Sequence, residues 1–296
     1  MLIPVMFVVV TLVFFLLRLV PGDPVDFILG ENPLPEARAM LIKAHHFDQP
    51  LFTRYKFYLK DIFSGNLGKS YFSEKSVNEL IGARYGATLE LAAAAIFWAL
   101  LISIPLGVFS AVRQGSGFDR ATLVFSLLGI SVPSFYLGPL LALFFSVYLD
   151  WFPLSGSELP GSLFLPSLTL GMAMAALLTR ITRASLLEVL HKDYVRTARA
   201  KGLSSFFVIF KHALRTALIP VIAILGLQFG TLLAGAVVTE KIFSWPGLGT
   251  LMLDAISQRN YAVVQGCVVL IAMTYVLVNW LTDIFYVVVD PRLKMG

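Results

Sequence analysis

Long apolar stretches separated by polar segments set the pattern along this chain. A bilayer core about 30 Å thick needs roughly 20 apolar residues in a helix that rises about 1.5 Å per residue. Six stretches meet this length, at residues 1–20, 88–112, 121–149, 163–181, 216–239 and 264–289. The pattern therefore predicts an all-α, polytopic membrane protein with six transmembrane helices.

The composition agrees with this prediction. Hydrophobic residues occupy 57% of the 296 positions and charged residues 14%, and the mean hydropathy is +0.81. A soluble globule with this balance would lack polar surface. Because apolar spans share one bilayer, we expect a single membrane domain over 1–296. It would comprise a first span at 1–20, an outer segment at 21–87, a five-span core at 88–289 and a tail at 290–296.

The first span has an alternative interpretation as a secretory signal. Its apolar stretch is longer than the usual core of such a signal, and Pro21-Gly22-Asp23-Pro24 is not a small-residue cleavage site. We therefore interpret it as a retained span.

Basic residues give the predicted direction of the spans. The Lys and Arg residues of one side are Arg113, Arg120, Arg180, Arg183, Lys192, Arg196, Arg199, Lys201, Lys211, Arg215, Arg292 and Lys294. The short loops opposite, at 150–162 and 240–263, contain only Lys241 and Arg259. Because short cytoplasmic loops are enriched in Lys and Arg, we expect the loop at 180–215 and the C-terminal tail to be cytoplasmic, with 21–87 outside.

The sequence carries no familiar catalytic or nucleotide-binding motif. The phosphate loop, the dinucleotide fingerprint, His-Glu-x-x-His and Gly-x-Ser-x-Gly are all absent. The four histidines, His45, His46, His191 and His212, divide equally between the two predicted faces of the membrane, which excludes a shared metal site. We expect no metal, no cofactor bound by this chain and no nucleic-acid partner, so any nucleotide chemistry belongs to a partner protein.

Polar and helix-breaking residues inside the spans are candidates for a translocation pathway. Asp283 lies deep in the last span, where a charge is costly. We favour an ion pair with Arg180 or Arg183, and a role in the pathway is the alternative. Gln228 in the fifth span either faces a polar cavity or bonds to a neighbouring helix.

The segment Ser131-Val132-Pro133-Ser134 is the best candidate for a kinked pathway wall. Proline removes a backbone hydrogen bond, so a broken helix tends to line a protein interior or a wet cavity. Ser131, Pro133 and Ser134 are the residues concerned, and a kink that merely improves packing is an equally open alternative.

The fifth span also carries small residues at intervals of four. Gly226, Gly230 and Ala234 form one narrow face, which a neighbouring helix can approach closely.

The loop at 180–215 has more pattern than a simple connection needs. Leu186, Leu187 and Leu190 give a helical apolar stripe, residues 194–200 predict two short turns, and Gly202 can end them in a left-handed conformation. A simpler interpretation is a basic face resting on anionic lipid headgroups, which needs charge but no particular small residues.

Several motifs in this loop and elsewhere occur in a fixed order. In the loop, Tyr194-Val195-Arg196-Thr197-Ala198-Arg199-Ala200-Lys201-Gly202-Leu203 precedes His212-Ala213-Leu214-Arg215 and Leu218-Ile219-Pro220. The others are Arg18-Leu19-Val20-Pro21-Gly22-Asp23-Pro24, residues 239–249, residues 259–266 and Asp290-Pro291-Arg292. Together they resemble the permease subunits of binding-protein-dependent ABC importers, in the peptide/nickel branch and within it the oligopeptide- and dipeptide-type "B" permeases.

The chain departs from the wider importer superfamily at a few positions. Arg196 stands where that superfamily has the Glu of its loop signature, and Arg215 stands where its Pro would fall. Both fit the peptide/nickel branch and argue against an importer of sugars or amino acids. The chain also begins inside the first span, without the short basic leader common in the family, so a truncated start is an open alternative.

The resemblance implies that the loop docks as a coupling helix into a groove on an ATPase subunit. The residues of this site would be Tyr194, Arg196, Thr197, Ala198, Arg199, Ala200, Lys201 and Gly202. Gly202 would allow a sharp exit, small Ala198 and Ala200 a close fit, and the cations would pair with acidic groups of the partner. The outer segment and the Trp245-Pro246-Gly247 turn would contact a binding protein.

The resemblance further implies a subunit of an ATP-driven peptide importer in the cell inner membrane. Its partners would be a second homologous permease, two ATPase subunits that bind ATP and Mg, an extracytoplasmic peptide-binding protein and membrane lipid. Import of nickel chelates or glutathione is the alternative. A secondary transporter or a membrane enzyme is more distant, because neither paired intramembrane charges nor a convergent acid, base and nucleophile set is evident.

Overall fold

The computed structural model describes residues 2–19, 25, 29, 35–44, 48–73 and 75–289. All structural statements below concern these residues. The predicted tail at 290–296 with its Asp290-Pro291-Arg292 motif, the stretch Pro21-Gly22-Asp23-Pro24, His45 and His46, and the side chain of Arg18 lie outside them.

The chain forms two compact units. The first combines Met1–Thr88 with Pro246–Val276, and the second combines Leu89–Trp245 with Leu277–Gly296. Helices α5 (Val77–Val112) and α13 (Tyr261–Val289) contribute residues to both units. Apart from an isolated bridge between Lys69 and Ser76, the regular structure of the described residues is helical.

Aromatic rings join α1 (Leu2–Leu19) to α4 (Leu51–Phe63) in the first unit, which also contains α3 (Pro35–Ala44). Phe14 is fully buried, and its ring centroid lies 5.1 Å from that of Tyr55 and 5.2 Å from that of Tyr58. The hydroxyls of Thr11 and Tyr55 are 2.6 Å apart and share a hydrogen bond. Each aromatic pair contributes about 0.5–1.5 kcal/mol beyond its buried area.

A turn at two glycines follows helix α4. Helix α4 ends at Phe63, and Gly65 and Gly68 follow with φ of +76° and +88°. Glycine adopts this left-handed backbone without the Cβ clash that other residues meet. The chain can therefore turn back toward α5, which begins at Val77.

An apolar cluster joins the first turns of α5 to α12 (Leu248–Ser257) and α13 in the first unit. Its buried residues are Val77, Ile81, Leu248, Ala255, Val263, Val264 and Cys267. The backbone N–H of Leu248 donates to Thr88 Oγ1 at 2.8 Å, which satisfies one free donor at the start of α12.

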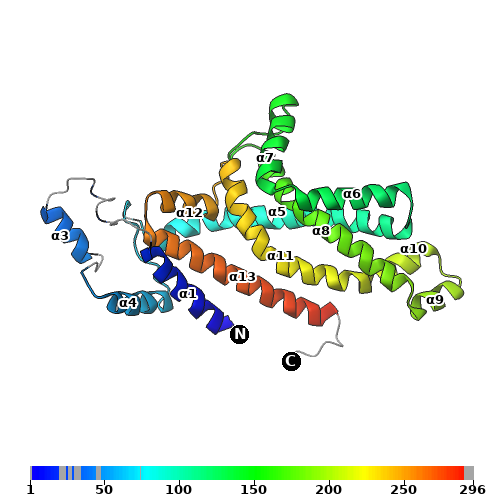
Figure 1. Cartoon of the computed structure of the whole chain (residues 1–296), viewed down its shortest axis with the longest axis horizontal. Coiled ribbons are helices and arrows are strands. Elements are labelled where there is room, and N and C mark those ends of the chain that lie inside the picture. Colours follow the sequence, from blue (N-terminus) through cyan, green and yellow to red (C-terminus); the bar gives the residue numbers. More distant parts are fainter. Residues whose placement is uncertain are drawn as a thin grey trace. The chain divides into compact units, whose positions relative to one another are not determined.

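Helix α8 (Phe164–Leu190) organises the second unit. It lies against α6 (Gly117–Ser131), α7 (Ser134–Ala142) and α11 (Leu214–Ile242), as Figure 1 shows. A π-helical turn, η1 (Leu143–Tyr148), continues α7. After α8 come the short helices α9 (Asp193–Ala200) and α10 (Ser205–Phe207) and the π-helical turn η2 (Val208–Ala213), which leads into α11.

Glycines set the closest contacts of α8. A Cβ on Gly171 would lie 2.7 Å from the Ala95 carbonyl oxygen, one on Gly107 would lie 2.6 Å from Thr182 Cβ, and one on Gly129 would lie 2.5 Å from Ala176 Cβ. Small residues of this kind let helices pack closely in lipid, where the hydrophobic effect does not drive them together. Helices α5 and α6 are therefore fixed on α8 by shape.

Four described helices are long and apolar enough to cross a membrane, at Val77–Val112, Phe164–Leu190, Ser205–Ile242 and Tyr261–Phe285. They correspond to the second, fourth, fifth and sixth predicted spans. The apolar part of α1 that the structure describes, Pro4–Leu16, is shorter. The all-α prediction is confirmed, and the prediction of six spans is confirmed in part.

The third predicted span is divided into two helices at the predicted kink. Gly117–Ser131 and Ser134–Tyr148 are bent by 105° relative to each other. Pro133 has no N–H to continue the ladder and disfavours helical backbone in the residue before it. Val132 is accordingly extended, with φ −85° and ψ 116°. The kink expected at Pro133 is present.

The contact at Gly171 gives a test of the packing around α8. Because overpacking costs about 1–3 kcal/mol, we expect Gly171→Val to lower the free energy of unfolding by about that amount. The midpoint temperature for aggregation of the detergent-solubilised protein should fall accordingly. Gly82→Ala on α5 is a suitable control, because a Cβ there would have nothing within 4 Å. Equal midpoints for the two variants would contradict the close contact.

Candidate functional site

The predicted turns at 194–200 form a single short helix, α9 (Asp193–Ala200). Helix α8 ends at Leu190, and α9 begins after a short turn at His191 and Lys192. Asp193 lies in the first turn of α9, where the helix dipole favours a negative charge. The helix therefore has its own start signal and is not a continuation of α8.

Gly202 ends α9 in the manner that the sequence indicated. Its φ is +79°. The N–H of Gly202 donates to the Arg199 carbonyl at 3.0 Å, and that of Leu203 donates to the Ala198 carbonyl at 3.4 Å. These two bonds form a Schellman motif, which requires a residue in the left-handed region at this position. The predicted left-handed end of the helix is confirmed.

One face of α9 packs on its own chain. Val195 is fully buried and Ala198 is 8% exposed. They belong to an apolar cluster, which we call the inner-face cluster, and which consists of Val108, Ala111, Leu186, Val189, Val195, Ala198, Val208, Ile209, Ala213 and Ala217. Helix α9 is thereby fixed to α5, α8, η2 and α11.

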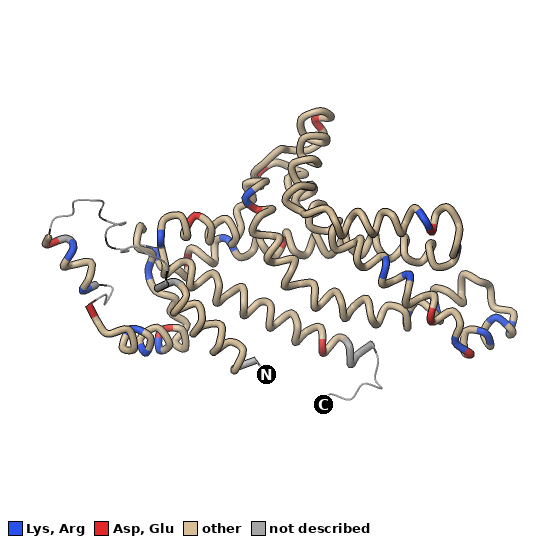
Figure 2. The backbone as a smooth tube through the Cα atoms, in the orientation of Figure 1, with Lys and Arg blue, Asp and Glu red and all other residues tan. Residues whose placement is uncertain are grey.

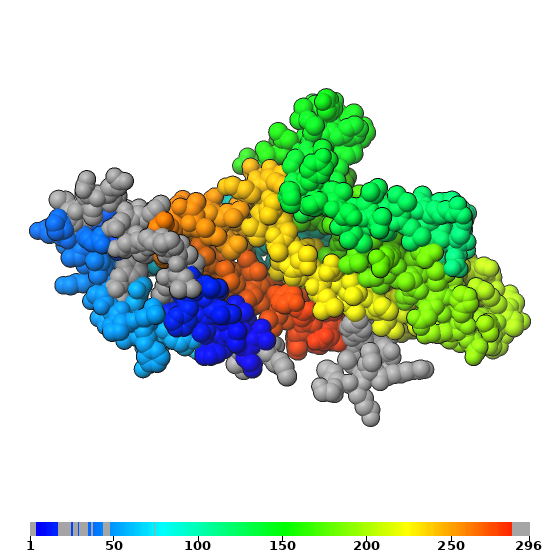
Figure 3. Space-filling view, in the orientation of Figure 1, coloured from blue at the N-terminus to red at the C-terminus, as the bar shows by residue number. Residues whose placement is uncertain are grey.

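The other face of α9 is exposed and basic. Its residues are Tyr194, Arg196, Thr197, Arg199, Ala200 and Lys201. Figure 2 shows that Lys and Arg gather where α9 lies, and α9 is uncovered at the surface in Figure 3. The ion pair of Arg196 with Asp193, at 3.9 Å, is exposed and contributes about 0–1 kcal/mol. The exposed cations remain available to a partner.

The two small residues predicted for a close fit to a partner differ in position. Ala200 is exposed beside the cations, whereas Ala198 faces the inner-face cluster. Ala198 therefore allows α9 to approach its own chain closely.

The ion pair predicted for Asp283 is wrong, because Arg183 pairs with a different carboxylate. Arg183 Nε donates to Asp119 Oδ1 at 2.6 Å and Nη2 donates to Oδ2 at 2.8 Å. Ser110 Oγ donates to Oδ1 at 2.5 Å, and the Gly115 N–H donates to Oδ2 at 2.8 Å. We call Ser110, Gly115, Asp119 and Arg183 the Asp119 network.

Sequence reasoning missed Asp119, although a signal was present. Ser116 caps the start of α6, its hydroxyl accepting from the Asp119 N–H at 3.2 Å, and an acidic residue three positions after a serine is typical of a helix start. A carboxylate at the edge of an apolar stretch also calls for a partner. Asp283 and Arg180 are exposed, and no ion pair joins Asp283 to Arg180 or Arg183 in the described chain.

Three of the predicted pathway residues line one cavity. Pro133 and Ser134, at the break between α6 and α7, and Gln228 of α11 surround a space of about 280 Å³. Its other walls are Gly129, Ile130, Val132, Leu170, Ala173, Met174, Leu177, Thr231, Leu232 and Gly235. Ser131 is not among them, and its hydroxyl donates to the Leu127 carbonyl at 2.8 Å. Asp283 does not line the cavity either.

The small-residue face of α11 is covered at one end. A Cβ on Gly226 would lie 2.5 Å from Thr282 Cγ2, so α13 approaches α11 closely there. Gly230 is half-buried and Ala234 is exposed. The face therefore serves helix packing within this chain at Gly226 and is open at Ala234.

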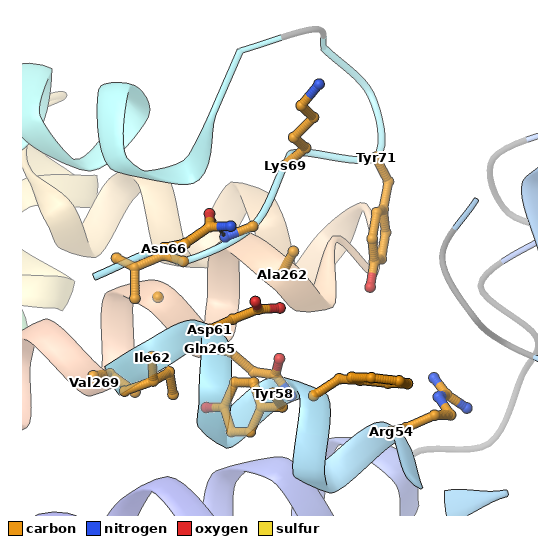
Figure 4. A pocket seen from close by; sticks show the side chains of 14 residues that line it. Arg54, Tyr58, Asp61, Ile62, Asn66, Lys69, Tyr71, Ala262, Gln265 and Val269 are labelled. Atoms are coloured by element: carbon orange, nitrogen blue, oxygen red, sulfur yellow. Dashed lines mark hydrogen bonds between the residues drawn. The ribbon is translucent and has the colours of Figure 1, made fainter. Parts of the chain in front are cut away.

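The first unit contains a second, more polar cavity of about 170 Å³. It lies between α4, the loop after it and the start of α13, and its ionisable residues are Arg54, Asp61, Lys69, Tyr58 and Tyr71. Figure 4 shows the Tyr71 ring pointing toward α4, whereas Lys69 points away from it. Burial lowers the pKa of the Arg54 guanidinium, and the nearby Tyr71 raises it in part.

The helical fold, with four described helices long and apolar enough to cross a membrane, defines a membrane protein. The chain belongs to the family described as "Binding-protein-dependent transport system inner membrane component", which matches residues 103–295. The family described as "Binding-prot-dependent transport system membrane comp, N-term" matches residues 2–92. The chain is therefore a membrane transport subunit and not an enzyme.

Relatives of known function cover nearly the whole chain. The di/tripeptide transport system permease protein DppB of Pseudomonas aeruginosa (strain UCBPP-PA14) is 43% identical over 323 residues, spanning 99% of this chain and 96% of the relative. The glutathione transport system permease protein GsiC of Escherichia coli (strain K12) is 41% identical over 297 residues, with the same coverage. The resemblance to peptide-type importer permeases is confirmed.

Solved structures share the fold of most of the chain. Two inward-facing structures of the MetNI methionine ABC transporter superpose with TM-scores of 0.60 and 0.57 at 20% sequence identity. Each covers 71% of this chain and 96% of the other chain. The similarity establishes an importer permease fold.

The cavity at the α6–α7 break can be tested by thiol labelling. A thiol reacts as the thiolate and therefore needs water. In a Cys267→Ala background, we expect Gln228→Cys to react at least about tenfold faster with a water-soluble maleimide than Leu127→Cys, which is exposed on the apolar surface of α6. Ala95→Cys, at a fully buried position, is the second control. Equal rates at Gln228→Cys and Leu127→Cys would contradict a wet cavity.

Proposed function

We propose that this chain is a permease subunit of an ATP-driven importer of short peptides and forms half of its translocation pathway. The observation that carries the proposal is α9, a short helix with a buried apolar face and an exposed basic face. Its inner face is fixed to four other elements of the chain. A force applied to α9 would therefore reach the helices that line the cavity.

The proposed arrangement in the membrane follows the distribution of basic residues. Helix α1 would be the first of six spans, and the broken pair α6–α7 would count as one. The loop with α9 and the C-terminal tail would face the cytoplasm, and the segment 21–87 would lie outside. The membrane would be the cell inner membrane.

The partner at α9 would be an ATPase subunit. Arg196, Arg199 and Lys201 are exposed and would pair with acidic groups in a groove of that subunit. ATP and Mg would be bound by two ATPase subunits and not by this chain. Their closure would shift α9 and expose the pathway alternately to the two sides of the membrane.

The remaining partners would complete the pathway and supply the substrate. A second homologous permease would provide the other half of the pathway. An extracytoplasmic binding protein would deliver the peptide to the outer segment, where the cavity beside Arg54 and Asp61 offers charges of both signs. The Trp245-Pro246-Gly247 turn is a further proposed contact.

Di- and tripeptides are the proposed substrates because DppB is named for their transport. Glutathione is the second candidate, favoured by the similar identity to GsiC. Nickel chelates and a secondary transport mechanism are the more distant alternatives.

Helix α9 can be tested through its terminal glycine. In Gly202→Val the left-handed backbone costs about 1–2 kcal/mol, which would weaken binding of the ATPase roughly five- to thirtyfold. We expect less ATPase to co-purify and peptide uptake to fall, while the protein still inserts. Nothing lies within 4 Å of a Cβ at Gly202, so a steric clash would not explain the effect.

Gly156→Val is the matched control for this experiment. Gly156 has φ +88°, also with nothing within 4 Å of a Cβ, but it lies in the loop before α8. The two variants carry the same backbone strain, and only one changes α9. Equal losses of ATPase binding, or none in either, would overturn the assignment of α9.

The energy source and substrate can be tested in proteoliposomes that contain the complete transporter. We expect uptake of a labelled tripeptide to require ATP and to survive a proton ionophore. An unlabelled tripeptide should compete at least about tenfold better than glutathione, a difference of about 1.4 kcal/mol in binding free energy. Uptake abolished by the ionophore in the presence of ATP would establish secondary transport, and stronger competition by glutathione would reassign the substrate.

A further inference from the structure

The Asp119 network ties together three helices in the second unit. Asp119, at the start of α6, is 2% exposed. Its carboxylate accepts four hydrogen bonds, from Arg183 on α8, Ser110 on α5 and Gly115 in the α5–α6 turn. A carboxylate so bonded has its hydrogen-bonding capacity filled and is held in one orientation.

The same helices carry α9. Val108 and Ala111 of the inner-face cluster flank Ser110 on α5, and Leu186 lies three residues after Arg183 on α8. The cluster also contains the two buried side chains of α9. The network and the cluster therefore share the same stretches of α5 and α8, and only the network includes α6.

Close packing also holds these helices together. Gly107 against Thr182 and Gly129 against Ala176 already bring α5 and α6 into close contact with α8. A buried ion pair is a costly addition, since well-packed apolar residues often give equal or greater stability. The bidentate pair also fixes the orientation of α6 relative to α8, because two parallel N–H···O bonds oppose both sliding and rotation of α6.

We propose that the Asp119–Arg183 pair positions α6 on α8 so that a displacement of α9 is transmitted along α6 to the cavity. Helix α6 runs about 18 Å from Asp119 to Ser131. At its far end Gly129 and Ile130, and then Pro133 beyond the break, line the cavity. Asp119 and Arg183 are positioning residues that touch no substrate, and the inference rests on the proposed function.

The test compares peptide moved with ATP hydrolysed in proteoliposomes of the complete transporter. In Arg183→Gln we expect the number of peptides transported per ATP to fall by about fivefold or more, in the range typical of a coupling energy between sites. ATPase co-purification and ATP hydrolysis should change less than about twofold, since α9 keeps its inner-face cluster. A purely structural role would lower the amount of transporter and leave this ratio unchanged.

Arg120→Gln is the matched control, because Arg120 is adjacent to Asp119 but exposed. Arg183→Lys keeps the positive charge but loses the guanidinium that makes two parallel hydrogen bonds. It should give an intermediate number of peptides transported per ATP. A wild-type ratio in Arg183→Gln would overturn the proposal. If the wild-type transporter did not use ATP at all, the proposed function would fail before any variant is compared.

Two double variants keep the test decisive if Arg183→Gln does not fold. Asp119→Leu with Arg183→Met replaces the pair by apolar packing, and we expect it to insert with the ratio still low. Asp119→Arg with Arg183→Asp reverses the pair, and we expect partial recovery of the ratio. A wild-type ratio in the apolar variant would overturn the proposal, and so would failure of both variants to insert, which would assign the pair to folding alone.

Discussion

The close approach of helices to α8 is the constraint on which the second unit depends. Lipid tails are as apolar as the side chains that face them, so the hydrophobic effect gives little net drive to helix association. Contacts at Gly171, Gly107 and Gly129 replace it with van der Waals packing at backbone distance. Because α5, α6 and α11 all pack on α8, the position of every candidate site in this unit follows from these contacts.

A second constraint is that polar groups away from water must find partners within the protein. The Asp119 carboxylate on α6 finds its partners on α5 and α8, at a place where these three helices are already close. The break at Pro133 is the opposite case, because a proline removes a donor and the chain turns instead of continuing. The ordered network and the cavity therefore lie at opposite ends of the same helix.

Local features of the site could be predicted from sequence, whereas its tertiary pairings could not. The end of α9 at Gly202 and the kink at Pro133 follow from backbone chemistry of single residues. Apolar length located four helices, but the 105° bend divided the third predicted span. The ion pair predicted between Asp283 and Arg180 or Arg183 was wrong, because the charge of a residue and its depth in a span do not say which helices are neighbours. The grouping of Pro133 with Gln228 likewise needed the packing of α11 on α8.

The composition of the cavity also bears on what it can select. Most of its walls are apolar, and Ser134, Gln228 and Thr231 provide its side-chain hydrogen-bonding groups. A peptide backbone presents a hydrogen-bond donor and an acceptor at almost every residue. Three side chains can satisfy only a few of these groups, so water would have to bond to the rest. If the cavity is part of the proposed pathway, binding there would be weak, and a conducting path must release what it admits. Selection among peptides would then fall to a component outside this cavity.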